Sequence, residues 1–396
     1  MKSKLWTKNF LIITLENFFV YFTYYILITI IAVYAAEEFG ASPSVAGLSA
    51  GIFIVGAILG RLFAGSSIER IGHKRLLYLS FVLFLLTTVL YFAAGNLPLL
   101  IGVRFLHGAA FGMTSTCTGT IAAEIIPNER RGEGTGYYAL SMTLATAIGP
   151  FLGMFLISRT SFKAPLMVCV VVLSISLLAA FPLRIPSCEV TRKGKKGNES
   201  SFWNSYIEKK ALPASYVTGL ACFAYSGVIS FLSSYSKSIG LMEAGSFFFL
   251  AYAAAILVSR PFTGYWFDRK GAKFVLYPTL LMFAWALVYL GTITKPYAVL
   301  VAGVFMGLGF GNFFAGGQAL AVKDSPDHRR ALATSTYYIF ADIGSGFGPF
   351  LLGGLVPVLG FRGLYFAMAG VVVVTIALFA VLYKGDAINK KGNYKR

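Results

Sequence analysis

The sequence predicts an all-α integral membrane protein in which twelve transmembrane helices form two pseudo-symmetric bundles of six. Three observations support this fold class: the composition, the spacing of long apolar stretches, and an internal repeat. Of the 396 residues, 57% are hydrophobic and only 13% are charged, about half the charged fraction of an ordinary soluble domain. The composition therefore excludes a soluble enzyme and indicates a chain mostly surrounded by lipid.

The apolar stretches are long enough to cross a bilayer, which takes about 20 mostly apolar residues per helix. Lysines precede the first stretch, but it is too long for the core of a signal peptide, so we expect it to be retained. The twelve predicted spans cover residues 10–35, 45–67, 76–94, 97–124, 134–158, 164–184, 212–236, 245–266, 274–293, 297–322, 332–357 and 363–383.

The basic residues predict the orientation of the chain. Of the 34 Lys and Arg residues, 26 fall in the termini and loops on one side, 5 in loops on the other, and 3 inside spans, namely Arg61, Arg104 and Arg260. Cytoplasmic loops carry the excess of Lys and Arg, so we expect a multi-pass protein of the cell membrane with both termini in the cytoplasm. Because the net charge of +18 is spread over every loop of one face, nucleic acid is excluded as a partner.

An internal repeat divides the chain into two halves. Residues 185–211 are polar and rich in Lys, Gly and Ser, which predicts a cytoplasmic linker between an N-terminal bundle at 1–184 and a C-terminal bundle at 212–396. A shift of 199 residues aligns landmarks of the two halves, although the first and seventh spans show no comparable match. The aligned pairs include Arg61 with Arg260, Gly72 with Gly271, Gly108 with Gly307, Pro127 with Pro326, and Gly149 with Gly348.

One aligned motif follows spans two and eight, and it resembles the loop motif of the major facilitator superfamily. Its first glycine permits close helix approach, and its second suits a tight turn. Basic residues alone would satisfy the topology of an ordinary cytoplasmic loop. The two copies consist of Gly65, Glu69, Arg70, Gly72 and Lys74, and of Gly264, Asp268, Arg269 and Gly271.

This resemblance covers essentially the whole chain and implies a transporter whose two halves rock about a site at the middle of the membrane. It also implies a gate. Glu69 and Arg70, together with Glu124 at the cytoplasmic end of span four, are expected to hold the halves together when the cytoplasmic side is shut.

Span four carries Arg104, His107 and Gly108, which resemble the family's Arg-x-x-Gln-Gly motif with His in place of Gln. An arginine inside a span costs at least about 2.5 kcal/mol unless it faces protein or water. Two interpretations follow: Arg104 and His107 tune proton coupling, or Arg104 extends to the outer surface of the membrane.

Span five carries Gly149, Pro150 and Gly153, and span eleven carries Gly348 and Pro349. The first set resembles part of a motif typical of proton-driven antiporters in this superfamily and favours export. A kinked helix with close packing is the alternative for both sets, because proline removes a backbone donor and glycine allows close approach.

Two carboxylates inside spans are the candidates for proton coupling, Glu16 in span one and Asp342 in span eleven. Ionisable groups within a membrane are costly, and they mark ion or proton pathways. Such a group can load and release a proton when water reaches it from alternating sides. The alternative is a carboxylate permanently paired with a cation or hydrogen-bonded to its neighbours.

Aromatic and amide side chains on the polar faces of several spans are candidates for lining a substrate cavity. They would bind an amphipathic or cationic solute through buried area and cation–π contacts. For any one of them, contact with lipid or with a neighbouring helix is the alternative. The candidates are Asn17, Tyr21, Tyr24, Tyr225, Asn312, Phe313, Gln318 and Tyr338.

The function expected from these features is proton-coupled export of small amphipathic organic molecules, either drugs or a secreted metabolite, by alternating access. The alternative is a proton symporter that imports a small nutrient. The sequence has no nucleotide-binding motif and no protease or hydrolase motif, and its four cysteines lack metal-ligand spacing. We therefore expect no enzyme activity, cofactor or metal, and a monomer whose partners are its substrate, protons and the lipid bilayer.

Overall fold

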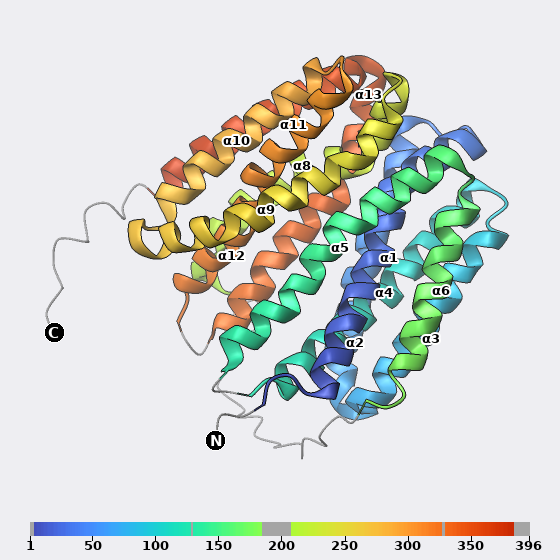
Figure 1. Cartoon of the computed structure of the whole chain (residues 1–396), viewed down its shortest axis with the longest axis vertical. Coiled ribbons are helices and arrows are strands. Elements are labelled where there is room, and N and C mark those ends of the chain that lie inside the picture. The colour runs from blue at the N-terminus through green and yellow to red at the C-terminus, as the bar shows by residue number, and fades with distance from the viewer. Residues whose placement is uncertain (1–3, 128–129, 184–206, 327–328, 384–396) are drawn as a thin grey trace, which may run out of the picture.

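The computed structural model describes residues 4–127, 130–183, 207–326 and 329–383, and the fold is all-α (Figure 1). Most of the predicted linker at 185–211 lies outside these ranges. The first half contains α1 (Lys8–Phe39), α2 (Pro43–Ile71), α3 (His73–Leu90), α4 (Leu97–Ile125), α5 (Arg131–Arg159) and α6 (Lys163–Ala179). The second half contains α8 (Leu212–Ser238), α9 (Met242–Lys270), α10 (Ala272–Thr292), α11 (Pro296–Met306), α12 (Asn312–Lys323) and α13 (Arg330–Leu382).

Polar caps define where several helices begin. Thr7 accepts a hydrogen bond from the backbone N–H of Phe10 at the start of α1, at 3.2 Å. Asn96 does the same for Leu99 at the start of α4, at 2.9 Å. Such caps satisfy backbone donors that have no partner inside the helix, so short polar turns fix the ends of otherwise apolar helices.

Among the described residues, ten helical stretches are long and apolar enough to cross a membrane, and α6 is a shorter apolar helix. One of the ten is made by α11 and α12, which a π-helical turn at Gly307–Gly311 joins into a single stretch. Another is α13, whose 53 residues contain a break at Gly360, where φ is 64°. Since one crossing takes about 20 residues, α13 is long enough for two.

Helices pack against one another within each half of the chain and also across the halves. Figure 1 shows α1–α6 on one side of the molecule and α8–α13 on the other, with α5 beside α9. The halves meet where α2 packs against α13, α5 against α9, and α1 against α8.

The sequence repeat is also a repeat of contacts. A Cβ atom added to Gly108 of α4 would lie 2.0 Å from the carbonyl oxygen of Phe53 in α2. One added to Gly307 would lie 2.2 Å from the carbonyl oxygen of Tyr252 in α9. Each residue of the second pair lies 199 positions after its counterpart in the first. Glycine is required at both places because the neighbouring backbone occupies the space of a side chain.

Two pairs of glycine turns distinguish the ends of the molecule. Gly72 and Gly271 join α2 to α3 and α9 to α10, with φ of 89° and 88°. Gly40 and Gly240 join α1 to α2 and α8 to α9, with φ of 62° and 71°. Positive φ favours glycine, as the sequence predicted for Gly72. We refer below to the Gly72 end and the Gly40 end.

Candidate functional site

A cavity of about 210 Å³ lies between the two halves. Its wall is formed by α1, α2, α4 and α5 from the first half and by α8, α9, α12, α13 and the π-helical turn from the second. Charged and aromatic side chains dominate the polar part of this wall. They are Arg61, Arg260 and Asp342, and the tyrosines Tyr21, Tyr24, Tyr25, Tyr225, Tyr252 and Tyr338.

An ion pair crosses the cavity wall between α2 and α13. A guanidinium nitrogen of Arg61 donates a hydrogen bond to a carboxylate oxygen of Asp342, and the two side chains are 30% and 18% exposed. The structure thus places Asp342 at the cavity, where the sequence predicted a proton-coupling group. Arg61 was recognised in the sequence only as an aligned landmark, and its part in the site was missed.

The equivalent position between α5 and α9 carries a different pair. Arg260 lies 199 residues after Arg61, and Asp342 lies 199 residues after Thr143. Arg260 donates to the hydroxyl of Thr143 at 3.1 Å, and both residues line the cavity. The repeat therefore brings an arginine to each interface, but among the described residues of the cavity wall only the α2–α13 interface supplies a carboxylate.

Five of the eight side chains predicted to bind substrate line the cavity: Tyr21, Tyr24, Tyr225, Gln318 and Tyr338. The ring of Tyr24 stacks on Phe111, with centroids 5.1 Å apart. The hydroxyl of Tyr338 donates to the side-chain oxygen of Gln318 at 3.3 Å. Prediction from sequence missed Tyr25 and Tyr252, because aromatic residues in the spans are too many for composition to tell which of them face the cavity.

Asn17 does not line the cavity. Its amide nitrogen donates to Ser141 of α5 at 2.8 Å, and its oxygen accepts from Tyr138 at 2.8 Å. The side chain is 2% exposed. The nitrogen and the oxygen of its amide both bond to α5, so Asn17 joins α1 to α5 and its role is in helix packing.

Asn312 and Phe313 also lie away from the cavity wall. Asn312 donates to Ser259 of α9 at 2.8 Å and to the carbonyl oxygen of Leu308 at 3.2 Å. A π-helical turn leaves carbonyl groups without their usual partners, and the Asn312 amide supplies one. Phe313 is 1% exposed and belongs to the core.

Arg104 is fully buried between α2, α3 and α4, so its side chain does not extend to the membrane surface. It donates to the carbonyl oxygen of Ser49 at 2.9 Å and to the hydroxyl of Tyr91 at 3.3 Å. Its guanidinium also lies 4.5 Å from the centre of the Phe53 ring. The cost of burying this charge is offset by contacts within the first half.

His107 belongs to the same cluster. Its ring nitrogens lie 3.1 Å from the hydroxyl of Thr88 and 3.3 Å from the hydroxyl of Tyr91. Neither His107 nor Arg104 is among the residues that line the cavity. The motif of span four therefore joins α4 to α2 and α3, away from the residues of the cavity wall.

Glu16 is 1% exposed and is not among the residues of the cavity wall. In the described part of the chain, neither of its carboxylate oxygens nor the hydroxyl of Ser176 makes a hydrogen bond of normal geometry. A buried charge without partners is costly. The structure thus separates the two predicted proton-coupling carboxylates, with only Asp342 at the cavity.

The helix-packing motifs make the contacts that their glycines permit. A Cβ atom on Gly149 would lie 2.8 Å from Cβ of Tyr25, and one on Gly153 would lie 2.9 Å from the carbonyl oxygen of Ile26. Pro150 and Pro349 lie inside α5 and α13. The corresponding Gly348 meets Ser226 of α8, so the glycines of both motifs contact helices of their own half.

The halves close on each other at the Gly40 end. A Cβ atom on Gly47 would lie 1.9 Å from the carbonyl oxygen of Pro349, and one on Gly51 would lie 2.1 Å from that of Gly346. These contacts join α2 to α13. Two exposed ion pairs also link the halves at this end, Arg159 with Glu243 at 2.5 Å and Lys237 with Glu37.

At the Gly72 end the structure describes only part of the predicted gate. Among the described residues, nothing lies within 4 Å of a Cβ atom added to Gly65 or Gly264. Glu124 instead pairs with His73 of its own half, at 3.1 Å. The side chains of Glu69 and Asp268 lie outside the described part of the structure. Arg70, Lys74 and Arg269 are exposed, and the Arg269 guanidinium lies 4.7 Å from the centre of the Tyr265 ring.

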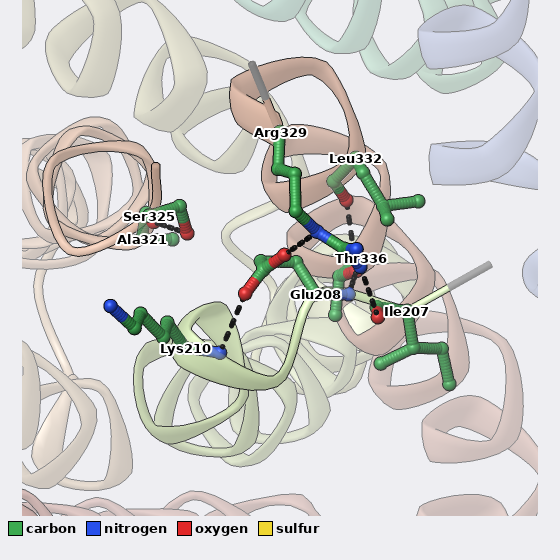
Figure 2. A network of polar contacts seen from close by, with 8 residues as sticks. All are labelled: Ile207, Glu208, Lys210, Ala321, Ser325, Arg329, Leu332 and Thr336. Atoms are coloured by element: carbon green, nitrogen blue, oxygen red, sulfur yellow. Dashed lines mark hydrogen bonds and ion pairs between the residues drawn. The ribbon is translucent and has the colours of Figure 1, made fainter. Parts of the chain in front are cut away.

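A polar network anchors the start of α8 to the start of α13, as Figure 2 shows. Arg329 pairs with Glu208, whose backbone N–H donates to the hydroxyl of Thr336 at 2.9 Å. Burial alone would raise the pKa of Glu208, but the backbone N–H of Lys210 and the Arg329 guanidinium outweigh it and hold that pKa below its usual value. This pair was not foreseen from the sequence.

The fold agrees with comparisons to known proteins. The sequence profile of the Major Facilitator Superfamily matches residues 13–311 and 242–396. The chain belongs to this superfamily. It is therefore a multi-pass membrane transporter and not an enzyme.

Two curated relatives come from Staphylococcus aureus. The staphylopine export protein is 22% identical, over 88% of this chain and 89% of that protein. The quinolone resistance protein NorA is 23% identical, over 93% and 96%. Among solved structures, a bacterial homolog of the human lysosomal transporter Spinster, in an inward-facing and unoccupied conformation, has a TM-score of 0.77. The two sequences are 15% identical, and the match covers 95% of this chain and 96% of the other. This likeness supports the fold.

Proposed function

We propose that this chain is a proton-coupled antiporter that exports small amphipathic organic molecules by alternating access. The observation that carries this proposal is the Arg61–Asp342 pair, which joins α2 to α13 beside the cavity between the halves. The names of the two staphylococcal relatives, which concern export and drug resistance, favour this direction of transport.

The pair offers a chemical route to coupling. When Asp342 is ionised, its charge holds the Arg61 guanidinium and so ties α13 to α2. When a proton binds the carboxyl group, the attraction is lost and the two helices can separate. Proton binding would therefore bias the equilibrium between two arrangements of the halves, which a transporter requires.

The proposed architecture is twelve spans in two bundles, residues 1–184 and 212–396, with both termini and the linker at 185–211 in the cytoplasm. In this arrangement the Gly72 end faces the cytoplasm and the Gly40 end faces outward. Contacts at the Gly40 end and open space around Gly65 support an arrangement in which the cavity is accessible from the cytoplasm. Glu69, Arg70 and Glu124 would engage only in the opposite arrangement.

Glu16, Arg104 and His107 remain candidates for the proton pathway. Arg104 and His107 lie behind the cavity wall, where Arg104 contacts the backbone of α2. We infer that they act by positioning α2, which carries Arg61. Glu16, enclosed within the first half, would serve as a second protonatable group only if water reached it in another arrangement.

Reconstitution into vesicles with an imposed pH gradient tests the proposal, with a panel of amphipathic drugs as candidate substrates. We expect the gradient to drive uptake into inside-out vesicles, and Asp342→Asn to abolish the dependence on the gradient. If flux is independent of the pH gradient in both the unchanged protein and Asp342→Asn, the proposal of proton coupling is wrong. Accumulation in the direction of proton flow would instead indicate the alternative function, a symporter that imports a nutrient.

A further inference from the structure

The two arginines of the cavity wall differ in their charge environment. Within the described part of the chain, Asp342 is the only acidic residue that lines the cavity, and Arg61 already pairs with it. Arg260 has a hydroxyl as its partner, which cannot neutralise a guanidinium. The wall thus carries one positive charge in excess, and that charge is on Arg260.

Arg260 is an exposed residue of the cavity wall. Its partner Thr143 is 8% exposed. The Thr143 hydroxyl occupies one of the five N–H donors that arginine carries. The remaining donors form a planar fork that matches a carboxylate or a similar oxyanion.

The surroundings of Arg260 suit an aromatic or aliphatic body attached to that anion. Tyr252 and Ile256 precede Arg260 on α9 and line the same cavity, and Tyr225 stacks on Phe310 with ring centroids 3.9 Å apart. Rings of this kind bind flat apolar groups through buried area. The cavity therefore combines one unneutralised cation with a broad aromatic surface.

We propose that Arg260 binds a negatively charged group of the substrate, so that the transported molecules are amphipathic organic anions such as aromatic carboxylates. This inference rests on the proposed transport function and assigns its substrate class. The duplicated arginine has separate roles at the two interfaces: Arg61 is neutralised by Asp342, and Arg260 is neutralised by the cargo.

Three probes with one indole body and different charge test the assignment: indole-3-acetate, indole-3-ethanol and tryptamine. Equilibrium binding to the full chain in nanodiscs, without a pH gradient and with empty nanodiscs as the background, gives three affinities. We expect indole-3-acetate to bind at least about tenfold more tightly than the other two, as one charge-assisted hydrogen bond would provide. Equal affinities, or no binding of any probe, would overturn the assignment.

Substitutions at two positions locate the effect. Thr143→Asp places a carboxylate where the repeat has Asp342, so it should neutralise Arg260 and remove the preference for indole-3-acetate. Thr143→Asn, a neutral control of the same shape, should keep most of the preference. Arg260→Gln should abolish it, and Arg260→Lys should restore part of it. Thermal unfolding verifies that each variant is folded, and an unchanged preference in Thr143→Asp would contradict the proposal.

Separate measurements of binding and of transport distinguish a failure of the anion site from a failure of the proposed antiporter function. Anion-selective binding without gradient-driven flux would retain the site and reject the antiporter. Gradient-driven flux of neutral or cationic molecules, unaffected by Arg260→Gln, would retain the antiporter and reject the anion site.

Discussion

The contact between α2 and α13 and the contact between α5 and α9 are related by the same repeat, yet they differ in charge and in closeness. The first has an arginine–carboxylate pair and glycines that meet backbone to backbone. The second has an arginine–threonine pair, and Phe151 meets Phe247 with ring centroids 5.2 Å apart. Duplication preserved the positions of the helices while the chemistry at their contacts diverged. The comparison indicates that the two interfaces have different roles in transport.

The largest expected effect comes from making the interfaces alike. Asp342→Thr would give each arginine a hydroxyl partner and leave Arg61 without a counter-charge. Breaking a pair of this kind is costly, and we expect gradient-driven flux in vesicles to fall about 100-fold.

Adding Thr143→Asp to that variant restores one arginine–carboxylate pair, but at the other interface. We expect no recovery of flux, because Arg260 would then be neutralised by the protein. Recovery in the double variant would show that the interfaces are interchangeable and would contradict the division between them.

The close contact between α2 and α13 leaves no room for a side chain at Gly51. In Gly51→Ala the added Cβ would lie 2.1 Å from the carbonyl oxygen of Gly346, so the helices must separate. Overpacking of this kind costs about 1–3 kcal/mol, and the melting temperature in detergent should fall.

Gly65→Ala on the same helix is the matched control, because nothing lies within 4 Å of its Cβ. We expect its melting temperature to stay the same or to rise, since alanine favours a helix by up to about 1 kcal/mol. Equal destabilisation by both variants would argue against a special contact at Gly51.

Glu208 and Arg329 form an arginine–carboxylate pair that lies away from the cavity, and they provide a comparison for Arg61 and Asp342. The pKa of Glu208 is lower in the folded chain than in the unfolded chain. Its contribution is therefore complete above the unfolded value and is lost as pH falls through the folded value.

Glu208→Gln should lower the free energy of unfolding by about 1–2 kcal/mol near neutral pH and by less in acid, as thermal unfolding at several pH values would measure. Flux should keep its dependence on the pH gradient. A loss of that dependence would mean that the coupling extends beyond the cavity.

The smallest effect is expected at the Gly40 end. Arg159 and Glu243 join α5 to α9, and their side chains are 57% and 67% exposed. Exposed pairs contribute at most about 1 kcal/mol and are screened by salt. Arg159→Gln should lower the melting temperature slightly at low salt and leave it unchanged at high salt. A large decrease would mean that this ion pair contributes more to stability than an exposed pair should.

Much of this fold could be predicted from the sequence because hydropathy and glycine positions act locally. The observed apolar helices overlap the predicted spans, but the sixth is shorter than a span and the last two belong to one long helix. The 199-residue shift located Gly108 and Gly307, whose need for close contact is a property of each position. Asp342 was predicted as a proton-coupling group because a carboxylate inside a span is costly without a function, and it lies at the cavity.

The rest depended on partners that are distant in sequence. Asn17 was assigned to the cavity, but its amide is satisfied by Ser141 and Tyr138, more than 120 residues away. Arg61 and Arg260 were aligned without their partners, because nothing local indicates that Thr143 is the counterpart of Asp342. A repeat shift applied to acidic residues as well as to glycines would have exposed that difference.

Gly360 divides α13 into two apolar arms without an intervening loop. The arm before it carries Asp342, and the arm after it packs with α10. A one-residue connection keeps the end of the first arm beside the start of the second, so a displacement of that end would reach the second arm. Removing the proton from the Asp342 carboxyl group would thereby also move the second arm of α13, on the lipid-facing side of the protein.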